Sequence, residues 1–372
     1  MNPVPVNIPV LKGNELKYLS ECITTGWISG EGPFIRKFEE QFSAYNNREF
    51  GIAVSNGSAA LDIAIRALDI KDGDEVIMPT FTIISPAQSL VNEGAVPVLV
   101  DCDPKTWNMD ISQVEAKITS KTKAILVVHI YGLPVDMDPV LDLAKKYNLK
   151  IIEDAAEMHG QSYKEKKCGS FGDISIFSFY ANKAITTGEG GMILTDDFML
   201  AERCKKLRNL AFEPNGKRFV HNELGWNYRM TNMQAAIGVA QLEQIDSIIQ
   251  RKREIGKLYN DELLFLTDEG FSLPLVDVDY AKNIYWVFGI VSPDQESCED
   301  LINYLTKLKI GTRPFFWCMH EQPVFKELNL FTGEKYANAE HLARCGFYLP
   351  SGLGLTNNDL LYITKKIKEY FV

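Results

Sequence analysis

The sequence predicts an α/β protein, with a mostly parallel, seven-stranded sheet covered by helices and a smaller C-terminal α+β domain. Short runs rich in valine and isoleucine alternate with segments of helical periodicity between residues 50 and 210. These runs lack the polar alternation of half-exposed strands, so both faces of the sheet should be covered. The length of 372 residues exceeds what one ordinary core requires, which favours two domains.

The N-terminal part is expected to be an extended arm, because its first residues include prolines and no long apolar run. Helices are predicted over residues 14–23 and 34–45, with a glycine-rich loop at residues 26–33 between them. Trp27 and Ser29 lie in this loop. Trp27 is either a ligand contact or a packing anchor, and the loop pattern fits both.

The large domain should hold the seven strands and most of the helices. The predicted strands are residues 51–55, 75–79, 97–101, 124–129, 150–154, 174–179 and 192–195. The predicted helices between them are residues 59–68, 84–93, 111–118, 139–146 and 200–210.

A Thr-x-x-Gln capping box at Thr231 predicts the start of a long helix that continues to about residue 264 and crosses into the second domain. Strands at 281–291 and 310–314 and helices at 298–308 and 358–370 should follow. The expected division is a large domain at residues 1–245, including the arm, and a small domain at residues 246–372.

Charge and composition exclude several classes of protein. The net charge of −10 argues against nucleic acid or an anionic membrane as the main partner. The chain has no secretory signal and no run of the ~18 apolar residues that a membrane span needs, so we expect a cytoplasmic protein. Seven scattered cysteines and five dispersed histidines favour reduced thiols and no metal site.

Lys183 is the first candidate for chemistry. It follows the apolar run at 174–179 and precedes a glycine turn at 188–191. A lysine at the mouth of a buried sheet is partly desolvated, which lowers its pKa and favours the neutral amine that attacks an aldehyde. The alternative is a surface lysine beside a hairpin.

Two further strand ends carry polar groups. An Asn56-Gly57 turn precedes a helix that begins at Ser58. The free N–H groups and the dipole of this helix suit a phosphate, which the glycine lets approach the backbone; Ser58 could equally be a simple N-cap. Asp154 ends a buried strand, where a carboxylate requires a cation or several donors. A protonated pyridine nitrogen would supply that cation, and the alternative is a loop aspartate that caps a helix. Phosphate donors, a carboxylate and a lysine are the three partners that pyridoxal 5′-phosphate needs.

Several stretches in order carry a family resemblance: SNGSAALDIA, EVIMPTFT, VPVLVDCDP, HIYGLPVDMD, IIEDAAE, FSFYANKAITTGEGGM and GWNYRMTNMQAAIG. The chain resembles the DegT/DnrJ/EryC1/StrS sugar aminotransferases, a branch of the fold-type-I pyridoxal-phosphate enzymes, from about residue 13 to the C-terminus. The likeness is to members that transfer an amino group from L-glutamate to a GDP-linked 4-keto-6-deoxyhexose. The same chemistry on a UDP- or dTDP-linked sugar or a keto sugar acid stays open, as does a non-catalytic sensor of this fold.

The resemblance also implies roles for individual residues. Lys183 would form the Schiff base and then carry protons, Asp154 would pair with the pyridine nitrogen, and Glu157 would lie near the ring hydroxyl. The phosphate would be held by Gly57, Ser58, Ala59 and Ser178, and by Asn227 of a neighbouring subunit, so that a homodimer shares its active sites. The substrate residues implied are Trp27, Ser29, Arg229, Arg313 and His320.

This sequence departs from the family pattern at two places. Ile83 stands where an aromatic ring usually stacks on the pyridine, so it would cover the cofactor without stacking. Residues 210–223 also differ and would line the substrate pocket, which leaves the sugar open. A related branch has histidine at the lysine position and catalyses dehydration; Lys183 argues against that activity.

Overall fold

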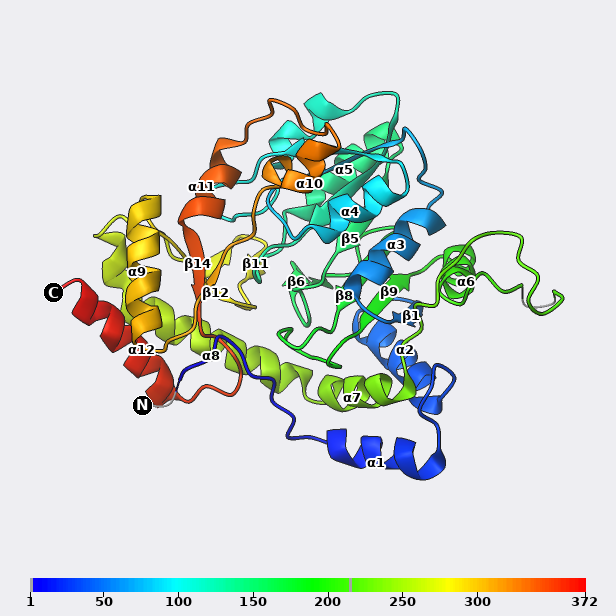
Figure 1. The fold of residues 1–372 in the computed structure, drawn as a ribbon, viewed down its shortest axis with the longest axis horizontal. Helices are drawn as coiled ribbons and strands as arrows, with labels where there is room; N and C mark the ends of the chain where they lie inside the picture. The colour runs from blue at the N-terminus through cyan, green and yellow to red at the C-terminus, as the bar shows by residue number, and fades with distance from the viewer. Residues whose placement is uncertain (1–2, 214–215) are drawn as a thin grey trace.

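The computed structural model describes residues 3–213 and 216–372, and its core is one seven-stranded sheet (Figure 1). The strands run in the order β1-β9-β8-β5-β4-β2-β3. Their bounds are β1 Phe50–Val54, β2 Glu75–Pro79, β3 Val96–Val100, β4 Thr122–Val128, β5 Lys150–Asp154, β8 Ile174–Ser178 and β9 Gly191–Thr195. All seven predicted strands are confirmed, with ends that differ by at most two residues.

Most neighbouring strands of this sheet are parallel. The pairs β3–β2, β2–β4, β4–β5 and β5–β8 are parallel, whereas β9 runs antiparallel to both β8 and β1. The strands β1, β2, β5 and β8 therefore point the same way, and their carboxyl ends meet at one edge of the sheet. Ligands of open α/β sheets bind at this edge.

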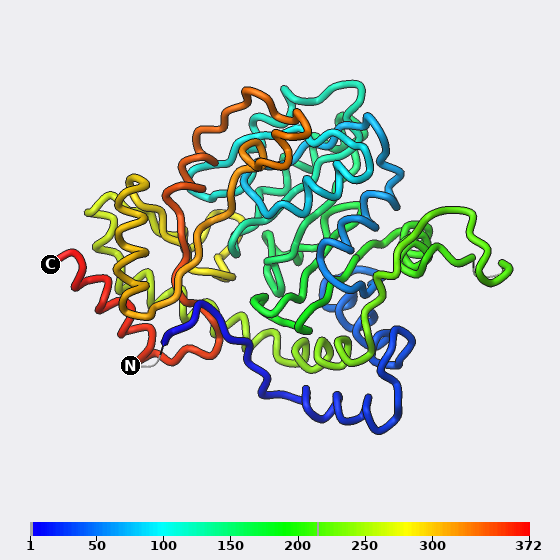
Figure 2. Tube along the Cα trace, viewed as in Figure 1, coloured from blue at the N-terminus to red at the C-terminus, as the bar shows by residue number. Residues whose placement is uncertain are grey.

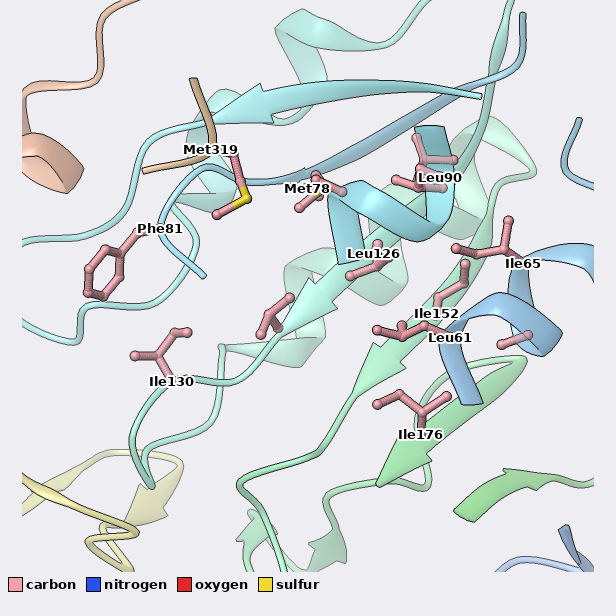
Figure 3. Close-up of a cluster of buried hydrophobic side chains, with 14 of the residues drawn as sticks. Leu61, Ile65, Met78, Phe81, Leu90, Leu126, Ile130, Ile152, Ile176 and Met319 are labelled. Carbon is pink, nitrogen blue, oxygen red and sulfur yellow. The ribbon is translucent and has the colours of Figure 1, made fainter. Parts of the chain in front are cut away.

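Helices cover both faces, as predicted. The helices α3 (Gly57–Ala67), α4 (Ser85–Asn92) and α6 (Phe198–Leu207) share one core cluster with alternate strand residues such as Ile152 and Ile176 (Figure 3). The intervening residues, such as Ile151 and Phe177, face the helices α2 (Pro33–Tyr45), α5 (Met137–Tyr147) and α7 (Asn232–Leu242) in a second cluster. Period-two alternation thus gives two apolar faces, each buried.

Two helix predictions are wrong. Residues 111–118 form two short 3₁₀ turns, Ile111–Gln113 and Glu115–Lys117, because the Asp110 side chain accepts hydrogen bonds from the Ser112 amide and the Gln113 side chain. The long helix after the confirmed capping box is broken at Gln244 into α7 and α8 (Ile245–Leu263). The helix α7 is buried around most of its circumference, whereas α8 buries one face.

The C-terminal part contains a small antiparallel sheet of β12 (Phe288–Val291), β14 (Gly346–Leu349) and β13 (Arg313–Pro314). The helices α9 (Gln295–Lys307) and α12 (Asn357–Tyr370) pack on it in a third core cluster. The sequence did not predict β14, α10 (Pro323–Glu327) or α11 (Ala337–Cys345). Residues of α10 and α11 belong to the core cluster of the large sheet, so this stretch does not pack as part of the small sheet's core.

The predicted arm is present and joins the two parts of the chain. Val4 pairs with Ile310 in a parallel bridge, and the Val6 carbonyl accepts from the Ser351 amide at 3.2 Å. The arm then runs past α8 to α1 (Glu15–Thr25) (Figure 2). Among the residues that the structure describes, no helix is long and apolar enough to span a membrane.

Candidate active site

A cavity of about 880 Å³ opens at the carboxyl edge of the large sheet. It is lined from three directions: by the strand ends, by the N-terminal arm, and by the C-terminal part of the chain. Of the residues predicted for the site, those in the lining are Gly57, Ser58, Ile83, Asp154, Glu157, Ser178, Lys183 and Arg313.

Lys183 lies in the connection after β8, and its side chain is 11% exposed. Its Nζ lies 3.8 Å from Glu157 Oε1 and 4.0 Å from the centre of the Trp286 ring. Burial lowers the pKa of this amine, while Glu157 and Asp154 partly oppose the shift. A lysine so placed supplies its neutral form more readily than a surface lysine does.

Two carboxylates face the same cavity. Burial raises the pKa of Asp154 to about 6, and the Ala156 amide and Lys183 oppose the rise. One Asp154 oxygen accepts from the Ala156 amide at 3.0 Å. Burial likewise raises the pKa of Glu157 to about 7, although Oε2 accepts from the Tyr131 amide at 2.7 Å. Both carboxyl groups lie at or just after the end of β5, where a bound cation would favour their ionised forms.

The start of α3 also faces the cavity. Asn56 caps this helix, because its side chain accepts the Ala59 amide at 2.8 Å. The Ala59 amide is thus already bound to Asn56 and lies outside the cavity lining, while Gly57 and Ser58 line it. The loop packs tightly on β8, since a Cβ on Gly57 would lie 2.9 Å from the Ser178 Cβ.

Besides Ala59, five residues that the resemblance assigns to substrate or phosphate lie outside the lining: Trp27, Ser29, Asn227, Arg229 and His320. Arg229 pairs with Val54 at the end of β1, and its Nε donates to Asn227 Oδ1 at 3.0 Å. Of these five residues, Trp27, Ser29 and Asn227 lie on the surface and Arg229 is half-buried.

His320 is buried behind the cavity wall. Its Nδ1 shares a hydrogen bond with Thr80 Oγ1 at 2.8 Å, and its Nε2 with Glu340 Oε1 at 3.1 Å. Both ring nitrogens are thus bound to the protein, so in this conformation the imidazole does not face a ligand.

The described residues of the segment 210–223 do not line the cavity either. The segment follows α6 and projects from the body of the protein (Figure 2). Two of its positions, 214 and 215, lie outside the described residues.

Several lining residues were not predicted. The most informative are Asn7 of the arm, Lys252 of α8 and Trp286. Two lining residues, Thr82 and Asn182, carry buried side-chain oxygens without a hydrogen-bond partner in the described chain. No periodicity or spacing marks these positions, because the fold brings them together from distant parts of the sequence.

Comparison with known proteins identifies the family. A sequence model of the DegT/DnrJ/EryC1/StrS aminotransferase family matches residues 9–368. The chain belongs to this family. The aminotransferase is 43% identical to the GDP-perosamine synthase of Escherichia coli O157:H7, over 100% of its own length and 99% of that protein. It is 42% identical to the GDP-perosamine synthase of Caulobacter vibrioides, over 99% and 98% of the two chains.

A solved structure agrees with these matches. DesV of S. venezuelae superposes with a TM-score of 0.89 at 31% identity, over 96% of this chain and 94% of that one. The predicted fold class is confirmed, and the chain is a pyridoxal-phosphate-dependent sugar aminotransferase.

The residues of the cavity fit that cofactor. Asp154 is a buried carboxylate at the cavity wall that accepts a hydrogen bond from the Ala156 amide, and a protonated pyridine nitrogen would be a cationic partner for it. The tight Gly57–Ser178 contact leaves the amides at the start of α3 close to the cavity, where a phosphate can approach. Lys183 offers an amine of lowered pKa for the aldehyde.

Proposed function

We propose that this aminotransferase moves the amino group of L-glutamate to a nucleotide-linked 4-keto-6-deoxyhexose, with GDP as the nucleotide, for a surface polysaccharide such as an O-antigen. The observation that carries the proposal is one cavity lined by Lys183, Asp154 and the start of α3. The identities of 43% and 42% to two GDP-perosamine synthases over nearly the whole chain support the sugar. The same chemistry on a UDP- or dTDP-linked keto sugar is the second candidate, since Arg313, an exposed cation of the lining, suits the diphosphate of any sugar nucleotide.

Each residue of the lining has a proposed task. When bound, pyridoxal phosphate supplies the aldehyde that takes up the amino group and an electron sink for the α-carbon. Lys183 holds the cofactor between turnovers and moves a proton between carbon atoms once its amine is released. Asp154 would hold the pyridine nitrogen in its protonated form, and Glu157 would hydrogen-bond the ring hydroxyl. Ile83, which is 47% exposed in the lining, would contact the bound cofactor as an apolar side chain and could not stack on it as an aromatic ring does.

Phosphate binding is assigned to the start of α3 and the end of β8. Gly57, Ser58 and Ser178 line the cavity, and the Ser58 hydroxyl already shares a hydrogen bond of 2.8 Å with Ser85. Ala59 would contribute only if the Asn56 cap released its amide. Arg313 is an exposed cation of the lining and suits the carboxylate of glutamate or the diphosphate of the sugar nucleotide.

We infer that the working unit is a homodimer. Trp27 and Asn227 lie on the surface, Arg229 is half-buried, and Leu224 and Phe219 expose 82% and 73% of their surface close to Asn227 in sequence. A second copy seated on this surface would bury these apolar side chains and bring Asn227 to its neighbour's phosphate site. His320 would support the sugar site from behind through Thr80. We also propose a cytoplasmic location for this enzyme.

The experiment is a panel of half-reactions and complete turnovers. The purified, cofactor-loaded protein receives L-glutamate or L-glutamine, then GDP-, UDP- or dTDP-linked 4-keto sugars, and mass spectrometry detects the amino sugar. We expect glutamate and the GDP sugar to give the highest kcat/KM. A higher kcat/KM with another nucleotide would contradict the proposed substrate. Failure to bind the cofactor at all would favour a sensor.

A further inference from the structure

The two residues before Lys183 have their carbonyl groups held by side chains from distant parts of the chain. Asn7 Nδ2 donates to the Ala181 carbonyl at 3.2 Å, and Trp286 Nε1 donates to the Asn182 carbonyl at 3.0 Å. The Lys183 amide itself donates to the Tyr180 carbonyl at 2.9 Å. Three successive carbonyls ahead of the lysine therefore have partners, and two of these partners lie outside the large sheet and its helices.

The segment around Lys183 needs such support. It has no regular secondary structure between Tyr180, which bridges to Gly188, and the start of β9. Apart from this bridge, a hydrogen bond of 3.0 Å from the Thr187 amide to the Phe179 carbonyl closes the loop. Thr186 is held as well, because its amide donates to Gln241 Oε1 at 3.4 Å and its hydroxyl to the Phe179 carbonyl at 2.9 Å. Among the described residues, the carbonyls of Ala181 and Asn182 have no partners other than Asn7 and Trp286. A displacement of about 1 Å at a reacting group costs about 10²-fold in rate.

The arm places Asn7 by backbone contacts on both sides. Upstream, the Val4 amide donates to Lys309 at 2.9 Å and its carbonyl accepts from Gly311 at 2.8 Å. Downstream, Gln241 Nε2 donates to the Val10 carbonyl at 3.0 Å. The fit around Asn7 is close, since a Cβ on Gly352 would lie 2.6 Å from its Oδ1. The arm thus lines the cavity with Pro5, Val6, Asn7 and Pro9.

Trp286 is fixed in a similar way. Its carbonyl accepts from Lys252 Nζ at 2.7 Å, and the same ammonium donates to the Ser351 carbonyl at 2.7 Å. Ser351 in turn donates its amide to Val6 of the arm. Lys252 therefore ties together the two chain segments that flank the cavity opposite the strand ends. The Trp286 ring lies 4.0 Å from Lys183 Nζ, so this residue contacts both the backbone and the amine of the lysine segment.

We propose that Asn7 and Trp286 are paired positioning residues, which fix the backbone of residues 181–183 so that the Lys183 amine returns to one point of the cavity in each cycle. The arm is in consequence a wall of the active site and not a mere tether between domains. The proposal rests on the proposed function for its kinetic consequence, but its structural part concerns the cofactor-free chain.

The test uses Asn7→Ala, Asn7→Asp and Trp286→Phe, with Lys12→Ala as the control on the exposed part of the same arm. Asn7→Asp removes the donor and places a carboxylate against the Ala181 carbonyl, while Trp286→Phe keeps an aromatic ring but removes the N–H. In the cofactor-free proteins, hydrogen exchange at residues 181–185 should be at least about 10-fold faster than in the parent and in Lys12→Ala. In the loaded proteins, the half-reaction with L-glutamate should lose about 10-fold in kcat, with KM changed less than about twofold.

Two results would overturn the proposal. One is exchange at residues 181–185 that stays within twofold of the parent in both Asn7 variants and in Trp286→Phe. The other is a lower melting temperature with kcat unchanged, which is what a purely structural arm would give. Because the exchange measurement needs neither cofactor nor sugar, it decides this proposal even if the panel of sugars shows the proposed substrate to be wrong.

Discussion

At the scale of single residues, the account depends on what each side chain of the lining does to a proton or a charge. Asp154 is the clearest case, because this carboxylate is 3% exposed and burial raises its pKa to about 6, although the Ala156 amide and Lys183 oppose the rise. Its folded-state pKa therefore lies above the ordinary value near 4. In the cofactor-free protein it binds a proton as the pH falls through about 6, and the protonated form cannot pair with a pyridinium.

We therefore predict that cofactor affinity falls as the pH is lowered through about 6, beyond the change caused by titration of the cofactor itself. In Asp154→Asn this step should be absent, and affinity at pH 8 should be about 10- to 100-fold weaker, since a hydrogen bond to a charged group contributes about 1.5–3 kcal/mol. Equilibrium titration of both proteins with pyridoxal phosphate from pH 5 to pH 8 measures this. Parallel pH profiles for the two proteins would contradict the assignment of Asp154.

Gly57 gives a second prediction at this scale. Gly57→Ala places a Cβ 2.9 Å from the Ser178 Cβ, so the start of α3 must move away from β8. Overpacking of this kind costs about 1–3 kcal/mol, and here the loss should fall on phosphate binding, as an affinity for pyridoxal phosphate reduced about 10- to 100-fold. Gly354→Ala is the matched control, because its Cβ would meet nothing closer than 3.7 Å. Equal affinities for the two variants would show that this loop does not hold the phosphate.

Among the helices, α8 carries a buried lysine, Lys252. This lysine should make the free energy of unfolding of the protein depend on pH. Burial lowers the pKa of Lys252 to about 7, well below the value near 10.4 of an unfolded chain. Between these two values the unfolded state binds more protons, so the free energy of unfolding should rise with pH. The rise cannot exceed about 1.4 kcal/mol per pH unit.

Lys252→Met should lack this rise. Its free energy of unfolding, measured by urea denaturation of the cofactor-free protein at pH 7 and pH 9, should change less with pH than that of the parent. Lys12→Ala serves as the control for loss of a lysine at an exposed site. If the parent and Lys252→Met respond equally to pH, the ammonium of Lys252 is not desolvated in solution.

The sequence predicted the strands of the large sheet better than any other feature of the protein. Buried parallel strands have a strong pattern, so all seven were predicted, and with them the strand ends that carry Asp154 and Lys183. The pattern of α7 and α8 merges into one helical period, so the break at Gln244 was missed. The turns at residues 111–117 were missed because the Asp110 side chain accepts a hydrogen bond from the Ser112 amide, and such bonds compete with those of a helix.

The partners of the site were harder to predict, for a physical reason. Asn7, Lys252 and Trp286 reach the cavity only through the packing of the arm and the C-terminal part on the large sheet, and no local pattern records that packing. His320 shows the converse, because the resemblance placed it near the sugar whereas Thr80 and Glu340 hold both its ring nitrogens.

At the scale of the whole molecule, the proposed homodimer predicts complementation between inactive subunits. Lys183→Ala should lose at least about 10³-fold in turnover, given the usual contribution of a positioned acid or base. Asn227→Ala should lose activity because it weakens the neighbouring subunit's phosphate site. A mixed dimer of the two variants contains one site with both defects and one site with neither.

Dissociated, mixed and reassembled subunits should therefore regain up to about one quarter of the parental activity, since half of the random dimers are mixed and each has one intact site. The control is the same procedure on each variant alone, which should stay inactive. Absence of any recovery, with mixed dimers shown by mass spectrometry, would mean that Asn227 does not act across the interface.

Reductive trapping tests whether Lys183 holds the cofactor. Borohydride reduction of the protein loaded with pyridoxal phosphate fixes the cofactor on the lysine that carries it, and peptide mass spectrometry locates it. The account predicts the label on Lys183, one per chain, and none on Lys252 although it lines the same cavity. A label on Lys252 or another lysine, with Lys183 unmodified, would contradict it.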